Sequence, residues 1–529
     1  MKLFLRRNAP FFYSLGAMLA IYIPWLNRGF NNYEYPFVFA GRALAFTSDS
    51  NLINGYFGTV ANPLGYSLTL SSFYRVFGFN DGFWFARLPA LLGTLLVLLS
   101  GWLITKSIWH ERRHFFYIWV TLLLLQPMFM VFSTSSTADI LPVGLLMFSI
   151  ALALDSYERK LAHKLLIGAI FGFGVIIKYN TAYFGLALVA AALLRDPAST
   201  WKKNKKIRDV LIYILVPGII LSAYLYWSHS RYGVFISSRL ELSQPNFFDV
   251  VSLTKNFVKY LSLFGLFLGF LPLTVVIVKC RSSGSILKWI GLAVLLIPIG
   301  WFSSGNYVGE MDLGLLFETK YQSFFRLVET LGFVTGVFFV ISMFMTMRST
   351  PLIKITILGG LIPYLFLISA SYPSQRYLTF VIPGALLLLV DAMRILSNRM
   401  QILSIGLTAI VFASASFLGL SYLTAQGSAS EKMAVWVEEN GLISQTSAGV
   451  IRPHAGQHFW VVKTTDLRYD VIAVTPATES RVSGRVLHRE PMKVLGRVTR
   501  IYLLQEMSNC PEWCRQFRRG KVSGGVVEE

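Results

Sequence analysis

Long uncharged apolar stretches recur along most of the chain, from near residue 11 to near residue 423. Each runs for about 18 to 22 residues, long enough for a helix to cross the roughly 30 Å hydrocarbon core of a bilayer. The runs are continuously apolar, and hydropathy places about thirteen of them as spanning helices. The pattern therefore predicts a mainly α, polytopic helical membrane protein.

Lys and Arg residues mark every second loop between these predicted helices. Loops on the cytoplasmic side carry an excess of Lys and Arg, so these clusters orient the spans. The clusters lie at residues 2–7, 106–113, 159–164, 202–208, 279–288, 348 and 394–399. The remaining loops are then expected on the periplasmic or external side of the inner (plasma) membrane.

The first external loop, residues 27–82, is unusually long and rich in Tyr and Phe. Loops longer than about 15 residues without structure of their own are uncommon in compact proteins. Short helices lying in the membrane interface are therefore expected there. The N-terminal apolar run before it has a basic start but no small-residue cleavage site, which predicts a retained first helix.

Composition agrees with this interpretation and narrows the function. The chain of 529 residues is 54% hydrophobic and 14% charged, with a mean hydropathy of +0.56, whereas soluble domains carry about 25% charged residues. Basic cytoplasmic loops and contact with anionic lipids explain the net charge of +21, so no nucleic-acid partner is expected. The sequence contains no Walker A motif, GxGxxG or DxD, which leaves an ATP-driven pump or a nucleotide-sugar enzyme without support.

The composition changes after the last predicted span. Residues 424–529 contain strand-like runs separated by turn residues, namely VWVEE, HFWVV, YDVIAV and RIYLL. We expect a transmembrane domain at residues 1–423 and a small external α/β domain at residues 424–529. In the second domain Cys510 and Cys514 either pair or stay free, and the loop-and-strand context of His454 and His458 disfavours a metal site.

Four ionisable residues fall on the predicted external side. Glu34 lies in the first loop, Asp139 and Lys178 lie at the ends of spans, and Arg376 lies just before another span. Ionisable groups at a membrane boundary are costly unless they are paired or used. Two carboxylates and two cations at one interface indicate a reaction in which a base meets a bound anion. The alternatives are helix capping by Asp139 and snorkelling anchors at Lys178 and Arg376.

Two further patterns have structural explanations. Gly168 and Gly172 form a small-xxx-small pair that predicts close packing of two helices. The basic run WKKNKK at residues 201–206 is expected to anchor a helix at the cytoplasmic surface, with binding of lipid headgroups as the alternative.

Several segments resemble the GT-C fold glycosyltransferases of the protein O-mannosyltransferase and aminoarabinose transferase type. The resemblance spans roughly residues 10–395 and rests on six segments in the family's order. They are NNYEYPFVFAGRAL, ANPLGYSLTLSSFYRVFG, FARLPALLGTL, TADILPVGLLMFSIAL, GFGVIIKYNTAYF and QRYLTFVIPGALLLL. In the family these segments correspond to an acidic pair before Ala-Arg, a Pro-Pro-Leu loop, an Arg-Leu-Pro segment, a second acidic site, a Gly-rich Lys segment and a late Arg-Tyr segment.

Two residues depart from the family's pattern. Counted back from Arg42, Glu34 occupies the second position of the family's Asp-Glu pair. Tyr33 stands at the first position, which is commonly assigned to the catalytic base, and Asn62 stands where the family often has a proline. Either Glu34 has taken over the role of the base, or the alignment slips, or the activity of this chain is altered.

The resemblance implies a polyprenyl-phosphate sugar as donor and inversion at the sugar carbon. Glu34 is expected to accept the proton of the acceptor hydroxyl, and Asp139 to position hydroxyls or to hold a divalent cation together with Glu34. Lys178 and Arg376 are expected to neutralise the leaving phosphate. Further candidates for substrate binding are Arg87, Arg42, Arg75 and Tyr33. The acceptor is expected to be a hydroxyl of a lipid, a glycan or a protein.

Two other functions remain open from the sequence. A lipid or sugar transporter or flippase also needs many spans, although midplane charges and an inverted repeat are then expected. A catalytically altered family member that acts as a scaffold is favoured by Tyr33. Release of polyprenyl phosphate distinguishes the enzyme from both.

Overall fold

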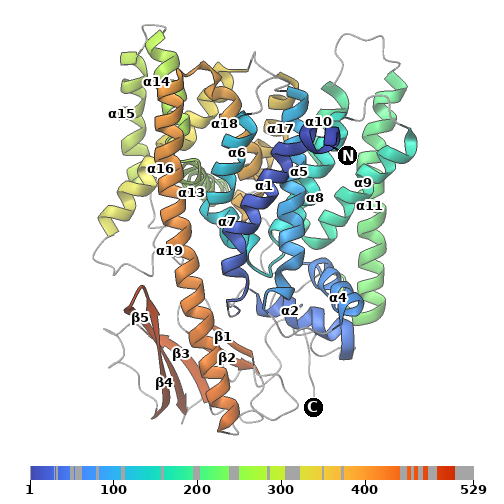
Figure 1. Ribbon diagram of the computed structural model, residues 1–529, viewed down its shortest axis with the longest axis vertical. Coiled ribbons are helices and arrows are strands. Elements are labelled where there is room, and N and C mark those ends of the chain that lie inside the picture. Colours follow the sequence, from blue (N-terminus) through green and yellow to red (C-terminus); the bar gives the residue numbers. More distant parts are fainter. Residues whose placement is uncertain are drawn as a thin grey trace.

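The computed structural model of the protein is a bundle of helices with a small sheet beside one end (Figure 1). It describes residues 2–28, 30, 34–47, 53, 57, 62–78, 83–108, 114–155, 160–194, 203–236, 249–282, 286–303, 322–347, 351–370, 375–440, 450–453, 458–462, 469–474 and 485–506. The predicted fold class, a mainly α membrane protein with a small sheet toward its C-terminus, is confirmed.

The helices follow one another with short breaks. In the first half of the chain they are α1 (Lys2–Leu26), α2 (Tyr35–Arg42), η1 (Ala43–Thr47), α4 (Gly65–Phe77), η2 (Phe85–Arg87), α5 (Leu88–Ile108), α6 (His114–Leu125), α7 (Pro127–Ser133), α8 (Ile140–Asp155), α9 (Leu161–Ile177), η3 (Tyr179–Phe184), α10 (Gly185–Leu194) and α11 (Lys203–Tyr232). In the second half they are α13 (Val250–Leu268), α14 (Leu271–Ser282), α15 (Ile286–Ser303), α16 (Gln322–Met345), α17 (Pro351–Ser369), η6 (Gln375–Phe380), α18 (Ile382–Ala392), η7 (Met393–Ile395) and α19 (Asn398–Glu439).

The chain is an integral membrane protein by the length and composition of its helices. Among the described residues, five helices are long and apolar enough to cross a membrane, or up to seven if each of two bent pairs counts as one span. Several shorter apolar helices of 10–17 residues accompany them. The count of about thirteen crossings is not confirmed, because hydropathy does not distinguish a full span from a short or bent helix.

Bends occur where the sequence interrupts helical hydrogen bonding. Helices α6 and α7 meet at 70°, where Pro127 opens α7 and Gln126 Oε1 accepts a hydrogen bond from the backbone N–H of Phe129 at 2.7 Å. Helices α13 and α14 meet at 85° next to Gly269, whose φ of +63° favours glycine. The first of these bends directs α7 toward the turn that carries Asp139.

Glycines allow close helix packing at the predicted places. A Cβ atom added at Gly172 would lie 2.9 Å from the Cα of Pro217 in α11, and one at Gly168 would lie 3.0 Å from Val216 Cβ. The packing explanation for this glycine pair is therefore confirmed. Helices α5 and α8 also pack closely, because a Cβ at Gly144 would lie 2.3 Å from the carbonyl oxygen of Gly93.

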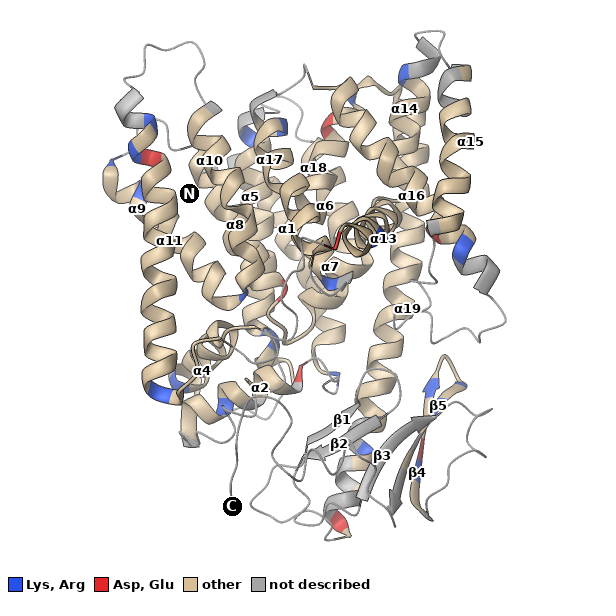
Figure 2. Ribbon diagram, turned by 180° about the vertical axis from the view of Figure 1, so that it is seen from behind, with Lys and Arg blue, Asp and Glu red and all other residues tan. Residues whose placement is uncertain are grey.

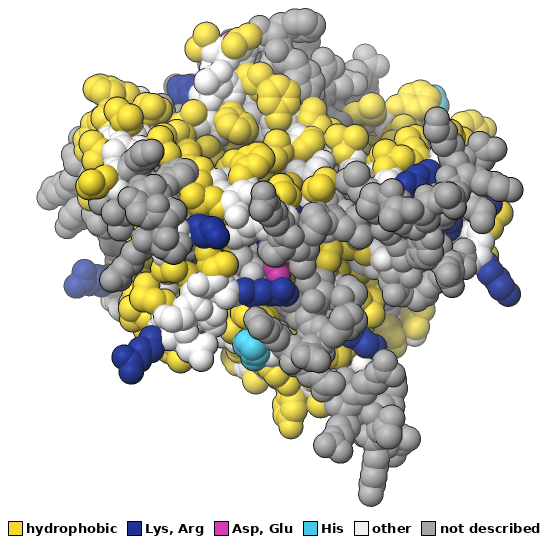
Figure 3. All heavy atoms as spheres, turned by 90° about the horizontal axis from the view of Figure 1, so that it is seen from above, with side chains coloured by type: hydrophobic (Ala, Val, Ile, Leu, Met, Phe, Trp, Pro, Cys, Tyr) yellow, Lys and Arg dark blue, Asp and Glu magenta, His cyan; other side chains and the backbone are white. Residues whose placement is uncertain are grey.

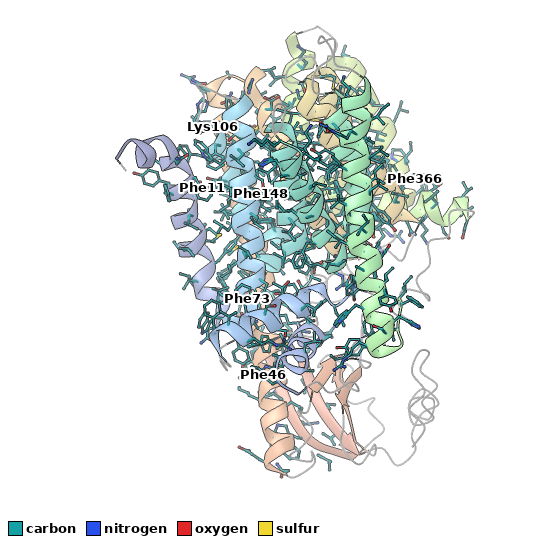
Figure 4. The ribbon with its side chains drawn as sticks, turned by 90° about the vertical axis from the view of Figure 1, so that its right-hand side faces the viewer. Phe11, Phe46, Phe73, Lys106, Phe148 and Phe366 are labelled. Atoms are coloured by element: carbon teal, nitrogen blue, oxygen red, sulfur yellow. The ribbon has the colours of Figure 1, made fainter. Side chains whose placement is uncertain are left out.

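Charged residues lie largely toward the two ends of the bundle, and the helices between these ends consist mostly of uncharged residues (Figure 2). Lys106 lies at one end and Phe46 and Phe73 at the other (Figure 4). The beginnings of α9, α11, α17 and α19 lie at the Lys106 end, whereas α2 and α4 lie across the end near the sheet (Figure 1). The beginnings of these helices therefore share one end of the bundle, and the assignment of that end to the cytoplasmic side stays a prediction. At the Lys106 end, Lys and Arg side chains are scattered among apolar ones (Figure 3).

The C-terminal strands form one antiparallel sheet beside the end of α19. The strands are β1 (Val450–Pro453), β2 (His458–Val462), β3 (Tyr469–Val474), β4 (Arg485–Val494) and β5 (Arg497–Glu506), in the spatial order β1-β2-β3-β5-β4. Trp436 of α19 stacks on His488 of β4 with ring centroids 4.5 Å apart, and Lys432 lies 3.3 Å from Glu490. Helix α19 runs through the boundary predicted after residue 423 without a break, and the division into two domains stays a prediction.

Candidate functional site

Glu34 is fully buried at the start of α2 and is held by two arginines. Arg87 contacts both carboxylate oxygens, with Nε 2.8 Å from Oε1 and Nη2 3.0 Å from Oε2. Arg28 Nη1 lies 3.1 Å from Oε2, and the backbone N–H of Ser136 donates to Oε1 at 2.7 Å. Both oxygens of Glu34 therefore already accept hydrogen bonds from charged or backbone donors, which are among the stronger ones in proteins.

Arg87 ties the carboxylate to the bundle. It ends η2, directly before the long helix α5, and has no exposed surface. Its Nη1 donates to the backbone carbonyls of Leu26 and Arg28, and its guanidinium lies 5.4 Å from the ring centroid of Phe30. Arg87, predicted as a candidate for substrate binding, therefore binds Glu34 and the backbone at and just after the end of α1.

The turn between α7 and α8, residues 133–139, connects two groups of charges. Every residue of the turn is buried. Arg28 Nη2 donates to the carbonyl of Thr134 at 2.9 Å and to Ser135 Oγ at 2.6 Å, and Ser136 donates to Glu34. Three successive residues of the turn are therefore held by the Arg28–Glu34–Arg87 cluster.

Asp139 closes this turn and forms a buried ion pair with Lys178. Asp139 precedes α8, and Lys178 is an extended residue between α9 and η3. Lys178 Nζ donates to Asp139 Oδ1, and their side chains are only 1% and 3% exposed. Burial and pairing of Lys178 disfavour the snorkelling explanation, whereas helix capping by Asp139 stays an open alternative.

Arg376 and a group of aromatic rings surround this pair. Arg376 is half-buried in η6 and is close enough to interact electrostatically with both Asp139 and Lys178. Lys178 Nζ lies 5.0 Å from the ring centroid of Tyr377 and 5.2 Å from that of Phe380. Rings at this distance stabilise a cation through their negative faces. The structure therefore brings Asp139, Lys178 and Arg376 together.

Two other predicted residues lie on α2 and α4, and several more fall outside the described residues. Arg42 ends α2 and is half-buried, and Arg75 is exposed on α4 and donates to the carbonyl of Leu44 at 2.6 Å. Tyr33, His454, Cys510 and Cys514 are outside the described residues, as is the side chain of His458. Within the described part of the chain, no three His, Cys, Asp or Glu residues come together as a metal-ligand group. A divalent cation shared by Glu34 and Asp139 stays a prediction.

Among the charged residues of the site that the structure describes, Arg28 is the one that the sequence interpretation missed. Burial lowers the pKa of its guanidinium to about 10, and the neighbouring Arg87 adds to this while Glu34 opposes it. A signal for Arg28 does exist in the sequence. It follows the first span on the predicted external side, where the bias of Lys and Arg toward the cytoplasm offers no reason for an arginine.

Buried ion pairs also occur at the opposite end of the bundle, away from the candidate site. Lys164 of α9 pairs with Asp209 of α11, and both side chains are at most 7% exposed. Asp391 lies 3.3 Å from Lys354 and 2.9 Å from Arg394. The Lys164–Asp209 pair is therefore a matched structural control for the pairs of the candidate site.

The site carries an excess of positive charge. Two carboxylates, Glu34 and Asp139, are set among four cations, namely Arg28, Arg87, Lys178 and Arg376. The two carboxylates also differ, because Glu34 accepts from two guanidinium groups and a backbone N–H, whereas Asp139 accepts from the ammonium group of Lys178 and lies beside the Thr137 side chain. Such a site fits an anionic ligand next to a carboxylate that can still interact with a substrate hydroxyl.

Comparison with known proteins gives one family match. Residues 61–227 match the family model described as dolichyl-phosphate-mannose-protein mannosyltransferase, so the resemblance inferred from the sequence is confirmed for this segment. The matched segment contains Asp139 and Lys178 but neither Glu34 nor Arg376. No curated protein sequence matches the chain significantly.

Two crystal structures of ArnT from Cupriavidus metallidurans are similar to the chain. The structure bound to undecaprenyl phosphate has a TM-score of 0.49 and 14% sequence identity, and the similarity covers 95% of this chain and 99% of that one. The apo structure has a TM-score of 0.44 and 15% identity, with 93% and 97% of the two chains covered.

Proposed function

We propose that the chain is a membrane glycosyltransferase that moves a sugar from a polyprenyl-phosphate donor to an acceptor hydroxyl at the predicted external face. One observation carries the proposal. The segment that matches the mannosyltransferase family model contains both members of the buried Asp139–Lys178 pair. A buried carboxylate and ammonium at one end of a membrane bundle suit a lipid-linked anion whose reaction releases a proton.

Lys178 and Arg376 are the groups we assign to the donor phosphate. Negative charge builds on that phosphate as the bond to the sugar breaks, and fixed cations stabilise developing charge most effectively. Lys178 is held between Asp139 and the rings of Tyr377 and Phe380, so its ammonium group is already oriented. Arg376 is the more accessible cation of the two.

The chemical role of a base fits Asp139 better than Glu34. In the proposed step the acceptor oxygen attacks the anomeric carbon, the bond from that carbon to the phosphate oxygen breaks, and the configuration inverts. The acceptor proton passes to a carboxylate, and polyprenyl phosphate leaves. Glu34, which the sequence resemblance suggested for this role, has both oxygens occupied by Arg28, Arg87 and Ser136. Asp139 accepts from Lys178 through Oδ1, and we assign the proton to it.

Release of polyprenyl phosphate tests the function. The reconstituted protein would be incubated with a panel of polyprenyl-phosphate sugars and a crude membrane extract that supplies lipid, glycan and protein acceptors. Release of lipid phosphate from one donor, accompanied by transfer of its sugar, is expected. No release from any donor by protein shown to be folded would reject the glycosyltransferase proposal and favour a transporter or an inactive scaffold.

Replacing Arg376 with glutamine is expected to raise the KM for the donor by about tenfold, since one hydrogen bond to a charged group contributes about 1.5–3 kcal/mol. The unfolding temperature should change little because the side chain is half-buried. Initial rates over a range of donor concentrations would measure this. Arg208→Gln, which removes a half-exposed arginine at the opposite end, is the control. An unchanged donor KM in Arg376→Gln would show that Arg376 is only a membrane anchor.

A further inference from the structure

Arg28 has an arrangement that neutralising Glu34 does not explain. Arg87 alone contacts both oxygens of that carboxylate. A second buried cation beside it is desolvated and also repelled by Arg87, and both effects lower the pKa of Arg28. A buried cation of this kind is costly for the fold unless its contacts compensate.

The contacts of Arg28 reach beyond Glu34 to the turn at residues 133–139. Nη1 of Arg28 donates a hydrogen bond to Glu34. Nη2 donates to both the carbonyl of Thr134 and the hydroxyl of Ser135. That hydroxyl in turn donates to the carbonyl of Val131 in α7 at 2.8 Å. Arg28 therefore joins three parts of the chain, namely the end of α1, the start of α2 and the end of α7.

The turn held in this way ends at Asp139. From Ser136, whose N–H donates to Glu34, three residues lead to the carboxylate that pairs with Lys178. A turn this short, buried along its whole length, transmits a shift of Thr134 or Ser135 to Asp139. The position of Asp139 relative to Lys178 therefore depends on the guanidinium of Arg28.

We propose that Arg28 is a positioning residue that sets the place of Asp139 through the turn at residues 133–139. The inference rests on the proposed function for its effect on turnover. Arg28 makes no contact with Lys178 or Arg376 among its described hydrogen bonds, so donor binding should depend on it only weakly. A misplaced catalytic group, in contrast, lowers the rate of the chemical step by up to about a hundredfold.

The test compares Arg28→Met and Arg28→Lys with Lys164→Met. Lys164→Met breaks a buried ion pair at the opposite end and controls for the loss of stability. Arg28→Met is expected to lower kcat per folded molecule by about ten- to hundredfold and to change the donor KM by less than about threefold. Arg28→Lys keeps the charge but cannot span Glu34 and the turn with one ammonium group, so an intermediate kcat is expected. Lys164→Met should unfold at a lower temperature with an unchanged kcat.

Hydrogen–deuterium exchange separates this inference from the proposed function. Amides of residues 133–139 should exchange at least about tenfold faster in both Arg28 variants than in the wild type and in Lys164→Met, because the turn loses its side-chain anchors. If the wild type releases no lipid phosphate, the proposed function fails while the exchange result still stands. Unchanged exchange in the turn, an unchanged kcat in folded Arg28→Met, or an equal loss of kcat in Lys164→Met would each overturn the positioning role.

Discussion

A Glu34→Gln protein is expected to lose thermal stability and turnover together. Glutamine cannot neutralise Arg28 and Arg87, whose side chains are at most 2% exposed. Removing one partner of a buried ion pair leaves an uncompensated charge and costs about 3–5 kcal/mol. The unfolding temperature in lipid nanodiscs, together with turnover of the fraction that remains folded, would measure both effects.

A double variant separates the charge effect from the chemistry. Glu34→Gln/Arg28→Met removes one of the two stranded cations and should recover part of the lost stability without recovering turnover. If Glu34→Gln instead unfolds at the wild-type temperature and loses only turnover, Glu34 is the base that the sequence resemblance suggested. Its contacts with the two arginines would then have no structural importance.

Asp139→Asn is expected to lower turnover of the folded protein by about 10²–10⁴-fold, the range for loss of a general base. The substitution also leaves the buried ammonium of Lys178 without its carboxylate, so a lower unfolding temperature is expected as well. Single-turnover rates at saturating donor, corrected for the folded fraction, would measure the chemical effect.

Asp209→Asn is the matched control for Asp139→Asn. It strands the buried Lys164 at the opposite end of the bundle in the same way, and its unfolding temperature should fall by a similar amount. Its turnover per folded molecule should equal that of the wild type. Comparable turnover in the two variants would show that Asp139 supports only the fold, and the base would have to be sought elsewhere.

The sequence was sufficient to find most of the charged residues of the site, but not Arg28, and it could not pair them. An ionisable residue beside an apolar span stands out because its burial is costly, and this indicated Glu34, Asp139, Lys178 and Arg376. Their partners depend on contacts between distant segments. Arg28 lies 106 and 107 residues from the turn residues it contacts, and no local pattern specifies such a contact.

The roles of the two carboxylates illustrate the same limit. Glu34 was expected to be a base because it occupies the second position of the acidic pair in the family that the sequence resembles. The structure adds two arginines and a backbone N–H around it, which favours a structural role. For Asp139, the sequence placed the carboxylate correctly near a helix start, but Lys178 lies 39 residues away, and only the fold brings the two together.

The sequence predicted the helical membrane fold correctly, but the predicted number of membrane crossings is not confirmed. Composition and continuous apolar runs were enough for a helical membrane protein. The number of crossings depends on bends such as the one at Pro127, and on helices of 10–17 residues that hydropathy cannot distinguish from complete spans. Hydropathy reports the apolar character of a segment and not its direction in the bilayer.

Helix α19 sets the height and the facing direction of the sheet. It is one helix of 42 residues, about 63 Å long at about 1.5 Å per residue, or roughly twice the bilayer core. It is fixed to the bundle at Ser416, which donates to the carbonyl of Leu125, and to the sheet at Trp436. One residue added between these points would raise the sheet by about 1.5 Å and rotate it by about 100°. The number of residues between these two points therefore sets the rotation of the sheet about the axis of α19. This rotation determines which side of the sheet faces the membrane surface.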